Sequence, residues 1–222
     1  MTYVMSDLHG CYDAYLQMLS LIGFSAEDHL YVLGDILDRG EKPLQMLMDL
    51  YGRKNATLLL GNHEYMARDV LRNPSNPSPA AETRKLNWYM NGGDLTANHF
   101  SLLPERDRML LCDYLDELPA WKILTVGEKT FVLVHAGLEP LESVDLVSRQ
   151  SVRKLVWLRP DLSQEAFSDP NVFVVFGHTP TKLLTGKWEI AHENRNICVD
   201  CGVAYGGRLA CLRLEDMKEF YL

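Results

Sequence analysis

The sequence predicts an α/β protein with two β-sheets packed face to face and helices on their outer sides. Strand-like and helix-like segments alternate in the first part of the 222-residue chain, and strand-like segments follow one another near its end. A chain that begins with alternating elements and ends with successive strands is typical of this architecture. In addition, five apolar runs end directly in clusters of polar side chains, which indicates a functional site at the strand ends.

The first part of the chain has the pattern of a β-α-β-α-β unit. Its expected elements are a strand at residues 2–5, a helix at 11–21, a strand at 30–33, a helix at 42–50, a strand at 57–60 and a helix at 65–71. Asp7, Asp35 and Asn62 follow the three strands at intervals of 28 and 27 residues, about the length of a parallel crossover unit. Because open α/β sheets bind ligands at the C-terminal ends of parallel strands, these side chains are expected to meet in one crevice.

The middle of the chain is expected to be a mainly helical insertion at about residues 73–118. Residues 73–79 read Asn-Pro-Ser-Asn-Pro-Ser-Pro and cannot continue a helix. Residues 82–118 are helical in pattern, with an interruption at Asn91-Gly92-Gly93 and candidate buried positions at 88–90, 102–103 and 109–111. The insertion is too short to be an independent domain, so we expect a single domain that spans residues 1–222.

After Pro119 the pattern changes to strands. Residues 121–126 and 130–134 flank a Gly-Glu-Lys turn, which is a hairpin signal, and the second arm ends at His135. A further strand ends at His178, and residues 197–199 and 209–214 are expected to form the last strands. Two more metal-binding side chains therefore follow strands in this half of the chain.

The composition is that of a globular protein, with 47% apolar and 23% charged residues. A formal net charge of −8 argues against non-specific nucleic-acid binding through a basic surface. No apolar run approaches the roughly 18 residues of a membrane span, and no signal peptide is evident. The five cysteines lack disulfide-scaffold spacing, and the Cys-x-x-Cys pair at 198 and 201 is interpreted as structural. We therefore expect a cytoplasmic protein that binds neither nucleic acid nor membranes.

The side chains at the strand ends form a mixed nitrogen and oxygen donor set. Its members are Asp7, His9, Asp35, Asn62, His135 and His178. Without a thiolate, such a set suits Mn, Fe or Zn. Six donors are too many for one catalytic ion with an open position, but they suit two divalent ions that share Asp35. Two ions about 3.5–4 Å apart hold a bridging hydroxide and stabilise an in-line displacement at phosphorus.

A phosphate ester is the substrate class that matches this donor set. Two divalent ions, two carboxylates and one hydroxide leave a net charge of roughly +1, to which Arg39 and Arg159 can add guanidinium groups that fit phosphate oxygens. The leaving alkoxide needs a proton, and His63 is the candidate donor. Asp38 can accept a hydrogen bond from the far ring nitrogen of His63, orient the ring and keep it protonated near neutral pH.

Five motifs, taken in order, resemble the signature of the phosphoprotein phosphatase family, a branch of the calcineurin-like metallophosphoesterases, in its bacterial and phage form. They are Asp7-x-His9-Gly10, Gly34-Asp35-x-x-Asp38-Arg39-Gly40, Gly61-Asn62-His63-Glu64, His135-Ala136-Gly137 and Gly177-His178-Thr179. The resemblance spans residues 7–208 and implies a four-layer α/β sandwich with a dinuclear metal centre. One departure is Ser6, where many members have Gly. Because Ser6 is not a ligand, we expect little consequence.

The resemblance also implies a role for each site residue. One metal would be held by Asp7, His9 and Asp35, and the other by Asp35, Asn62, His135 and His178. Mn is the favoured metal, with Fe or Zn as alternatives. His63 and Asp38 would be the catalytic acid pair, and the substrate phosphate would be bound by Arg39, Asn62 and Arg159.

Three functions are open at this point. The favoured one is hydrolysis of phosphoserine and phosphothreonine in proteins, with phosphotyrosine as a further substrate, by direct attack of metal-bound hydroxide. Small phosphate esters would be cleaved in vitro. The alternative is a symmetrical dinucleoside tetraphosphate hydrolase, but enzymes of that branch commonly lack the aspartate that corresponds to Asp38 and carry Asp where this chain has Glu64. A non-catalytic scaffold on the same fold would be expected to have lost ligands, and none is missing here.

Overall fold

The first β-sheet contains the N-terminal β-α-β-α-β unit and the end of the chain. The computed structural model describes residues 1–222. The sheet has the order β10-β9-β1-β2-β3, from β1 (Thr2–Met5), β2 (His29–Val32), β3 (Ala56–Leu58), β9 (Ala210–Arg213) and β10 (Lys218–Tyr221). β1, β2 and β3 are parallel, whereas β9 and β10 are antiparallel additions beside β1. The sequence predicted the parallel unit and missed β10.

The second sheet is formed by the second half of the chain. Its order is β4-β5-β6-β8-β7, from β4 (Trp121–Val126), β5 (Lys129–Val134), β6 (Val172–Phe176), β7 (Ala191–Glu193) and β8 (Asn196–Cys198). β4 and β5 form the predicted hairpin, and β6 and β8 continue in parallel beside β5. β7 is antiparallel to β8 and was not predicted. Both sheets are therefore mixed.

The two sheets pack face to face because successive side chains of a strand point to opposite faces. Val4 and Leu212 of the first sheet share one buried cluster with Phe131, Val175 and Ile197 of the second sheet. The opposite faces of the two sheets lie in two further buried clusters, one on the outer side of each sheet. Three apolar layers thus separate four layers of secondary structure.

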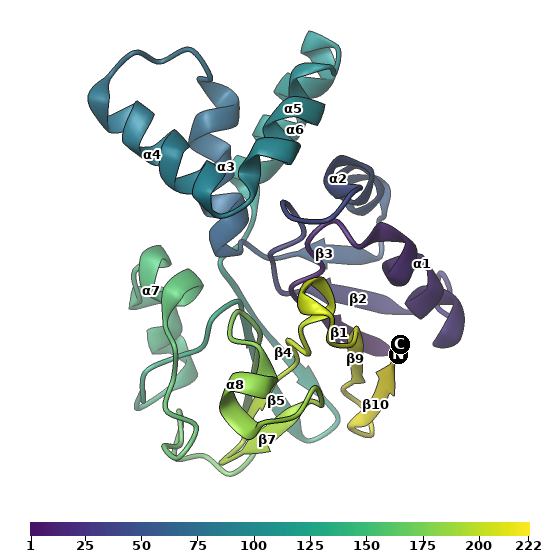
Figure 1. The fold of residues 1–222 in the computed structure, drawn as a ribbon. Helices are drawn as coiled ribbons and strands as arrows, with labels where there is room; N and C mark the ends of the chain where they lie inside the picture. The colour runs from purple at the N-terminus through teal and green to yellow at the C-terminus, as the bar shows by residue number, and fades with distance from the viewer.

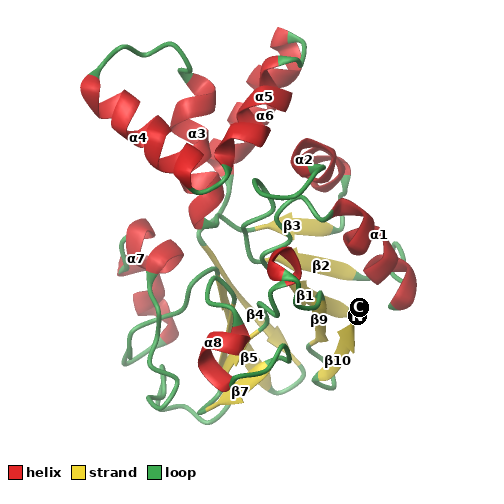
Figure 2. Ribbon diagram, viewed as in Figure 1, coloured by secondary structure: helices red, strands yellow, loops and turns green.

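Helices cover the outer faces of both sheets (Figures 1 and 2). On the side of the first sheet lie α1 (Tyr12–Leu21) and α2 (Pro43–Gly52), and on the side of the second sheet lie a 3-10 turn (Val144–Arg149), α7 (Val152–Trp157) and α8 (Thr181–Thr185). A second 3-10 turn, Val203–Tyr205, follows β8. The predicted fold class, an α/β sandwich of two mixed sheets flanked by helices, is confirmed.

The predicted helical insertion and the helix that precedes it form a group of helices that projects from the sheets (Figure 1). It consists of α3 (Asn62–Arg72), α4 (Pro79–Met90), α5 (Gly93–Ser101) and α6 (Glu105–Glu117). Trp88 and Leu111 are buried as expected, whereas Met90, Leu102 and Met109 are exposed. The prediction that neighbouring apolar residues are all buried was wrong, since consecutive residues of a helix point about 100° apart. No helix is both long enough and apolar enough to cross a membrane.

The cysteines all carry free thiols. Cys198 lies in the buried cluster on the outer side of the second sheet. Cys201 lies in the buried cluster between the two sheets. Their packing agrees with the structural interpretation of the Cys-x-x-Cys pair.

Candidate active site

The loops that follow the strands hold an unusual backbone conformation. Nine non-glycine residues have a positive φ, and six of them are predicted site residues: Asp7, His9, Asp35, Asp38, Arg39 and His178. Such a conformation costs on the order of 1–3 kcal/mol per residue and persists only where the surrounding structure enforces it. The packing is also tight, because a Cβ added at Gly177 would overlap a carboxylate oxygen of Asp7. Backbone strain is therefore concentrated at the strand ends that the sequence identified.

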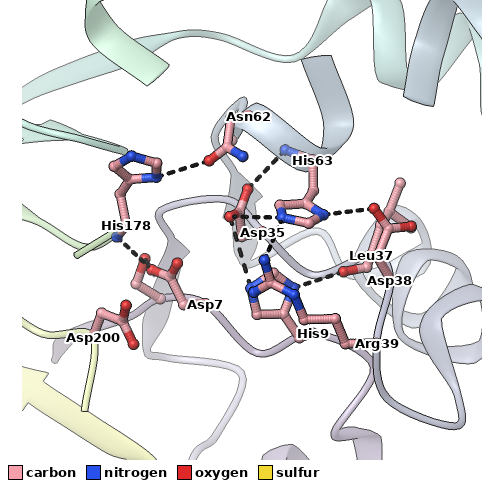
Figure 3. Close-up of polar contacts among 12 residues, drawn as sticks. Asp7, His9, Asp35, Leu37, Asp38, Arg39, Asn62, His63, His178 and Asp200 are labelled. Atoms are coloured by element: carbon pink, nitrogen blue, oxygen red, sulfur yellow. Dashed lines mark hydrogen bonds and ion pairs between the residues drawn. The ribbon is translucent and has the colours of Figure 1, made fainter. Parts of the chain in front are cut away.

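Four of the predicted metal ligands converge on one point. The side-chain oxygen of Asn62 lies 2.9 Å from Nε2 of His135 and 2.8 Å from Nδ1 of His178. Oδ1 of Asp35 lies 3.4 Å from Nε2 of His135. Donor atoms about 3 Å apart are spaced as ligands around an ion with bonds of about 2.1 Å. Asn62 begins α3 and the other three residues follow the ends of β2, β5 and β6; Figure 3 shows part of this cluster.

The predicted ligands of the other ion lie on the side of the site that the second carboxylate oxygen of Asp35 faces. Oδ2 of Asp35 is 3.8 Å from Nε2 of His9, and the group of donor atoms on this side also includes His63. Asp7 lines the same cavity, and its Oδ2 accepts hydrogen bonds from the backbone N–H of His178 at 2.9 Å and the Ser6 hydroxyl at 2.6 Å. Ser6 therefore donates a hydrogen bond directly to a predicted ligand, a contact that the sequence did not reveal.

The imidazoles of His9 and His135 have a fixed tautomer. Nδ1 of His9 lies 2.9 Å from the carbonyl oxygen of Leu37, and Nδ1 of His135 lies 2.8 Å from that of Leu33. Because a carbonyl only accepts, each Nδ1 carries the proton and each Nε2 presents a lone pair to the site. This arrangement is typical of metal-binding histidines.

Burial favours the neutral form of His9 and His178. Burial, followed by the His63 imidazole and the Arg39 guanidinium, holds the pKa of His9 well below its usual value. Burial together with His135 and Arg159 lowers the pKa of His178 to about 3. Neutral imidazoles around a shared carboxylate form a donor set that fits two divalent cations, one on each side of Asp35.

His63 and Asp38 form the predicted pair. Nδ1 of His63 donates to Oδ2 of Asp38 at 2.6 Å, and both side chains are buried (Figure 3). Burial and the Arg39 guanidinium hold the pKa of His63 well below its usual value, which favours the neutral ring. Burial also raises the pKa of Asp38 to about 7, and hydrogen bonds from Thr96 and Trp88 act in the opposite direction.

Trp88 and Thr96 are site residues that the sequence did not reveal. Nε1 of Trp88 donates to Oδ2 of Asp38 at 2.7 Å, and the hydroxyl of Thr96 donates to Oδ1 at 2.6 Å. The backbone N–H of Asp38 donates in turn to the Thr96 oxygen at 3.0 Å. The sequence signals near them were the predicted burial of residues 88–90 and the Asn91-Gly92-Gly93 break in the helical pattern.

Glu64 is a second residue whose role the sequence left open. Its buried carboxylate accepts backbone hydrogen bonds from Asp35, Ile36, Leu37 and Gly61, at 2.7–3.1 Å. Glu64 thus ties the loop that contains Asp35 to the first turn of α3. Its place in the Gly-Asn-His-Glu motif, beside two site residues, was the available signal.

Arg39 lies in the centre of the site. Its Nη1 contacts Nε2 of His9 at 2.5 Å and its Nη2 contacts Nε2 of His63 at 3.0 Å, while its guanidinium lies 4.9 Å from the ring centre of Tyr205. Because the lone pair of His9 Nε2 can serve only one partner, binding of a metal ion at His9 requires Arg39 to move. Arg159 lines the same cavity, as predicted.

The cavity that contains these groups has a volume of about 390 Å³. Its wall includes Trp157, Trp188, Tyr205 and Asp200, none of which the sequence assigned to the site. Burial, followed by the Asp7 carboxylate, raises the pKa of Asp200 well above its usual value. The structure therefore brings every predicted site residue into one cluster and adds an aromatic wall.

Comparisons with known proteins agree with this geometry. The sequence model of the family described as calcineurin-like phosphoesterase matches residues 2–209. Serine/threonine-protein phosphatase 1 of Salmonella typhimurium is 29% identical over 220 residues, covering 96% of this chain and 91% of that protein. The symmetrical bis(5'-nucleosyl)-tetraphosphatase of Vibrio campbellii is 29% identical over 281 residues, covering 99% of this chain and 97% of that protein.

Solved structures give the same fold. A crystal structure provisionally assigned as a diadenosine tetraphosphatase has a TM-score of 0.72 at 21% identity, covering 100% of this chain and 92% of that chain. A protein serine/threonine phosphatase from Saccharomyces cerevisiae has a TM-score of 0.64 at 14% identity, covering 100% and 78%. At these identities the similarity concerns the fold alone.

Proposed function

This chain belongs to the calcineurin-like phosphoesterase family, and on that premise we propose that it hydrolyses phosphoserine and phosphothreonine in proteins. The observation that carries the proposal is the 2.6 Å contact between Nδ1 of His63 and Oδ2 of Asp38 beside the metal-binding side chains. Phosphotyrosine is a further substrate of the same chemical kind, and small phosphate esters should be cleaved in vitro.

The acid pair matters because the two candidate reactions release different leaving groups. Serine and threonine phosphates release an alkoxide, a strong base that needs a proton as the P–O bond breaks. A dinucleoside tetraphosphate releases a nucleotide phosphate, which is a weak base and leaves without an acid. A histidine held by a buried carboxylate is therefore better suited to an alkyl phosphate ester.

The donor groups would hold two divalent ions. One would be bound by Asp7, His9 and Asp35, and the other by Asp35, Asn62, His135 and His178. When bound, the ions would polarise the phosphoryl oxygens and activate water for direct in-line displacement. Mn is the favoured metal, with Fe or Zn as alternatives, because the donors are imidazole nitrogens and oxygens without a thiolate.

Arg39 would change partners when the substrate binds. A phosphate dianion is a stronger acceptor than the neutral imidazoles of His9 and His63, so the guanidinium would turn to the phosphate oxygens together with Arg159. The phosphate charge would then favour the protonated form of His63. Asp38 would keep the ring oriented so that Nε2 can donate to the leaving oxygen, and the side-chain amide of Asn62 would contact the phosphate.

A direct comparison of two substrates tests the proposal. Under equal Mn²⁺, kcat/KM for a phosphoserine peptide should exceed that for diadenosine tetraphosphate by roughly 10²-fold, the lower end of the contribution expected from a general acid. The second candidate, a dinucleoside tetraphosphate hydrolase, is favoured by the Vibrio relative and by Trp157 and Trp188, whose rings could stack on a nucleobase. A preference for the tetraphosphate would establish that second candidate.

The proposal includes the setting of the reaction. The partner would be a phosphorylated protein or peptide, and the protein would bind neither nucleic acid nor a membrane. The five free thiols favour a reducing compartment such as the cytoplasm.

A further inference from the structure

A second cavity opens beside the catalytic one. It has a volume of about 490 Å³ and lies between α3, α4 and α7. Asn91 and Trp157 line both cavities, so the two are adjacent. α3 contacts both α4 and α7, and Figure 1 shows α4 and α7 on the same side of the molecule, one on either side of the start of α3. We call this second cavity the α3 groove.

The α3 groove lies in the direction in which the leaving group must point. His63, the proposed proton donor, is the second residue of α3, and Tyr65 and Met66 follow it on the same helix and line the groove. In an in-line displacement the leaving oxygen faces the acid and points away from the attacking water. The polypeptide attached to that oxygen therefore leaves the catalytic cavity on the α3 side.

Two arginines give the α3 groove a positive charge, although the whole chain has a formal net charge of −8. Arg84 on α4 and Arg153 on α7 both line it. The one acidic residue among the lining side chains, Asp69, approaches Arg84 only at 3.9 Å, and both side chains are more than half exposed. Such a loose surface pair leaves most of the arginine charge available to a ligand. Arg153 makes no ion pair, whereas its neighbour Lys154 is paired with Glu139.

Apolar side chains also line the groove, beside the polar side chains of Asn87 and Asn91. Met66, Met90 and Trp157 line it, and Met90 and Trp157 are 77% and 39% exposed. Flexible thioethers and an indole adapt to the side chains and backbone of a polypeptide. These apolar side chains offer contacts to a polypeptide that a chain of phosphates alone would not use.

We propose that the α3 groove binds acidic residues that flank the phosphorylated residue of a polypeptide substrate. Arg84 and Arg153 pair with the carboxylates, and Met66, Met90 and Trp157 contact the peptide between them. This specificity rests on the proposed phosphatase function and adds to it a preference for acidic sequence around the phosphorylation site.

The test compares three phosphoserine peptides that differ only in their flanking residues, which are Glu, Gln or Lys. In the natural protein, kcat/KM should be highest for the Glu peptide, and the double variant Arg84→Glu/Arg153→Glu should lower it roughly tenfold, as expected for two exposed charge pairs. Hydrolysis of para-nitrophenyl phosphate, which fills only the catalytic cavity, should be unchanged. The control Lys54→Glu/Arg106→Glu has the same change in charge at exposed positions outside both cavities and should keep the preference.

Three results would overturn the inference. One is equal kcat/KM for the Glu and Lys peptides in the natural protein. Another is an equal loss for all three peptides in the Arg84→Glu/Arg153→Glu variant. A loss confined to diadenosine tetraphosphate would also overturn it, since the groove would then serve a polyphosphate.

A binding measurement separates this inference from the proposed function. A fluorescently labelled peptide with Glu at the flanking positions and unmodified serine should bind, by anisotropy, and the Arg84→Glu/Arg153→Glu variant should weaken that binding roughly tenfold. If the peptide binds in this way but no phosphopeptide is cleaved, the proposed function fails and the groove specificity stands. If phosphopeptides are cleaved but the labelled peptide does not bind, the proposed function stands and the groove specificity fails.

Discussion

The indole of Trp88 donates a hydrogen bond to the carboxylate of Asp38 at 2.7 Å, across 50 residues of sequence. The bond connects a helix of the projecting group to the loop that follows β2, and both side chains are fully buried. With the hydroxyl of Thr96 on the other carboxylate oxygen, Asp38 has donors on both oxygens in addition to His63. The projecting helices are therefore part of the candidate active site.

We expect Trp88 and Thr96 to be positioning residues for the acid pair. Trp88→Phe and Thr96→Val should each lower kcat for a phosphoserine peptide roughly tenfold, because a donor to a buried charged group is lost. The effect on para-nitrophenyl phosphate should be small, since nitrophenolate leaves without a proton. Thr96→Ser keeps the hydroxyl and should retain activity. Equal losses on both substrates would indicate a merely structural role.

His63 should be the proton donor. His63→Asn should lower kcat for a phosphoserine peptide by roughly 10²-fold or more, the range of general acid catalysis. Bound metal, measured by mass spectrometry of the purified protein, should not change. Near-full turnover of the peptide by this variant would remove His63 from the mechanism.

Asp35 should be needed for both metal ions, because its two oxygens face different histidines: Oδ1 lies 3.4 Å from His135 and Oδ2 lies 3.8 Å from His9. We expect about two Mn²⁺ per chain in the natural protein, about one in His178→Asn and almost none in Asp35→Asn. Added Mn²⁺ should accordingly raise the Tm of the natural protein but not that of Asp35→Asn. Two ions retained by Asp35→Asn would contradict the shared-ligand arrangement.

Gly93 should be sensitive to the addition of a single methyl group. A Cβ at Gly93 would overlap the buried indole of Trp88, whereas a Cβ at Gly52 would meet nothing within 4 Å. Gly93→Ala should lower the free energy of unfolding by roughly 1–3 kcal/mol through overpacking, and Gly52→Ala should be neutral or stabilising. Urea denaturation of both variants measures the difference, and similar values for the two would contradict the packing described.

The thiols should differ in reactivity. Cys11 is partly exposed and the other four cysteines are buried. Burial raises the pKa of Cys201 to about 12, so its reactive thiolate is scarce until the pH approaches that value. Iodoacetamide at pH 8 should label Cys11 in the folded protein and all five thiols in urea, as peptide mapping would show. Rapid labelling of Cys201 in the folded protein would contradict its burial.

The sequence predicted the parts of the fold that follow from local pattern. The regular spacing of Asp7, Asp35 and Asn62 predicted three parallel strands with a common end, and the structure brings these side chains together. β7 and β10 were missed because each is a short edge strand of three or four residues, which forms by pairing with a neighbour and carries little pattern of its own.

The residues missed in the site act through long-range contacts. Trp88 and Thr96 lie 50 and 58 residues from Asp38 in sequence, and a tryptophan in a helical pattern indicates core packing, which here coincides with hydrogen bonding. The lowered pKa of His63 was not foreseen either, since it depends on how deeply the ring is buried and on the position of the Arg39 guanidinium. Both depend on tertiary structure.

The contact between Trp88 and Asp38 has a consequence for evolution and for engineering. α4 forms one wall of the α3 groove and also supplies the indole that anchors Asp38. On the proposed role of the groove, a change in α4 would therefore affect substrate recognition and the acid pair together. A chimaera that receives a foreign helical segment to change its selectivity would lose turnover as well, unless the donor segment brings its own indole and hydroxyl to the same two carboxylate oxygens.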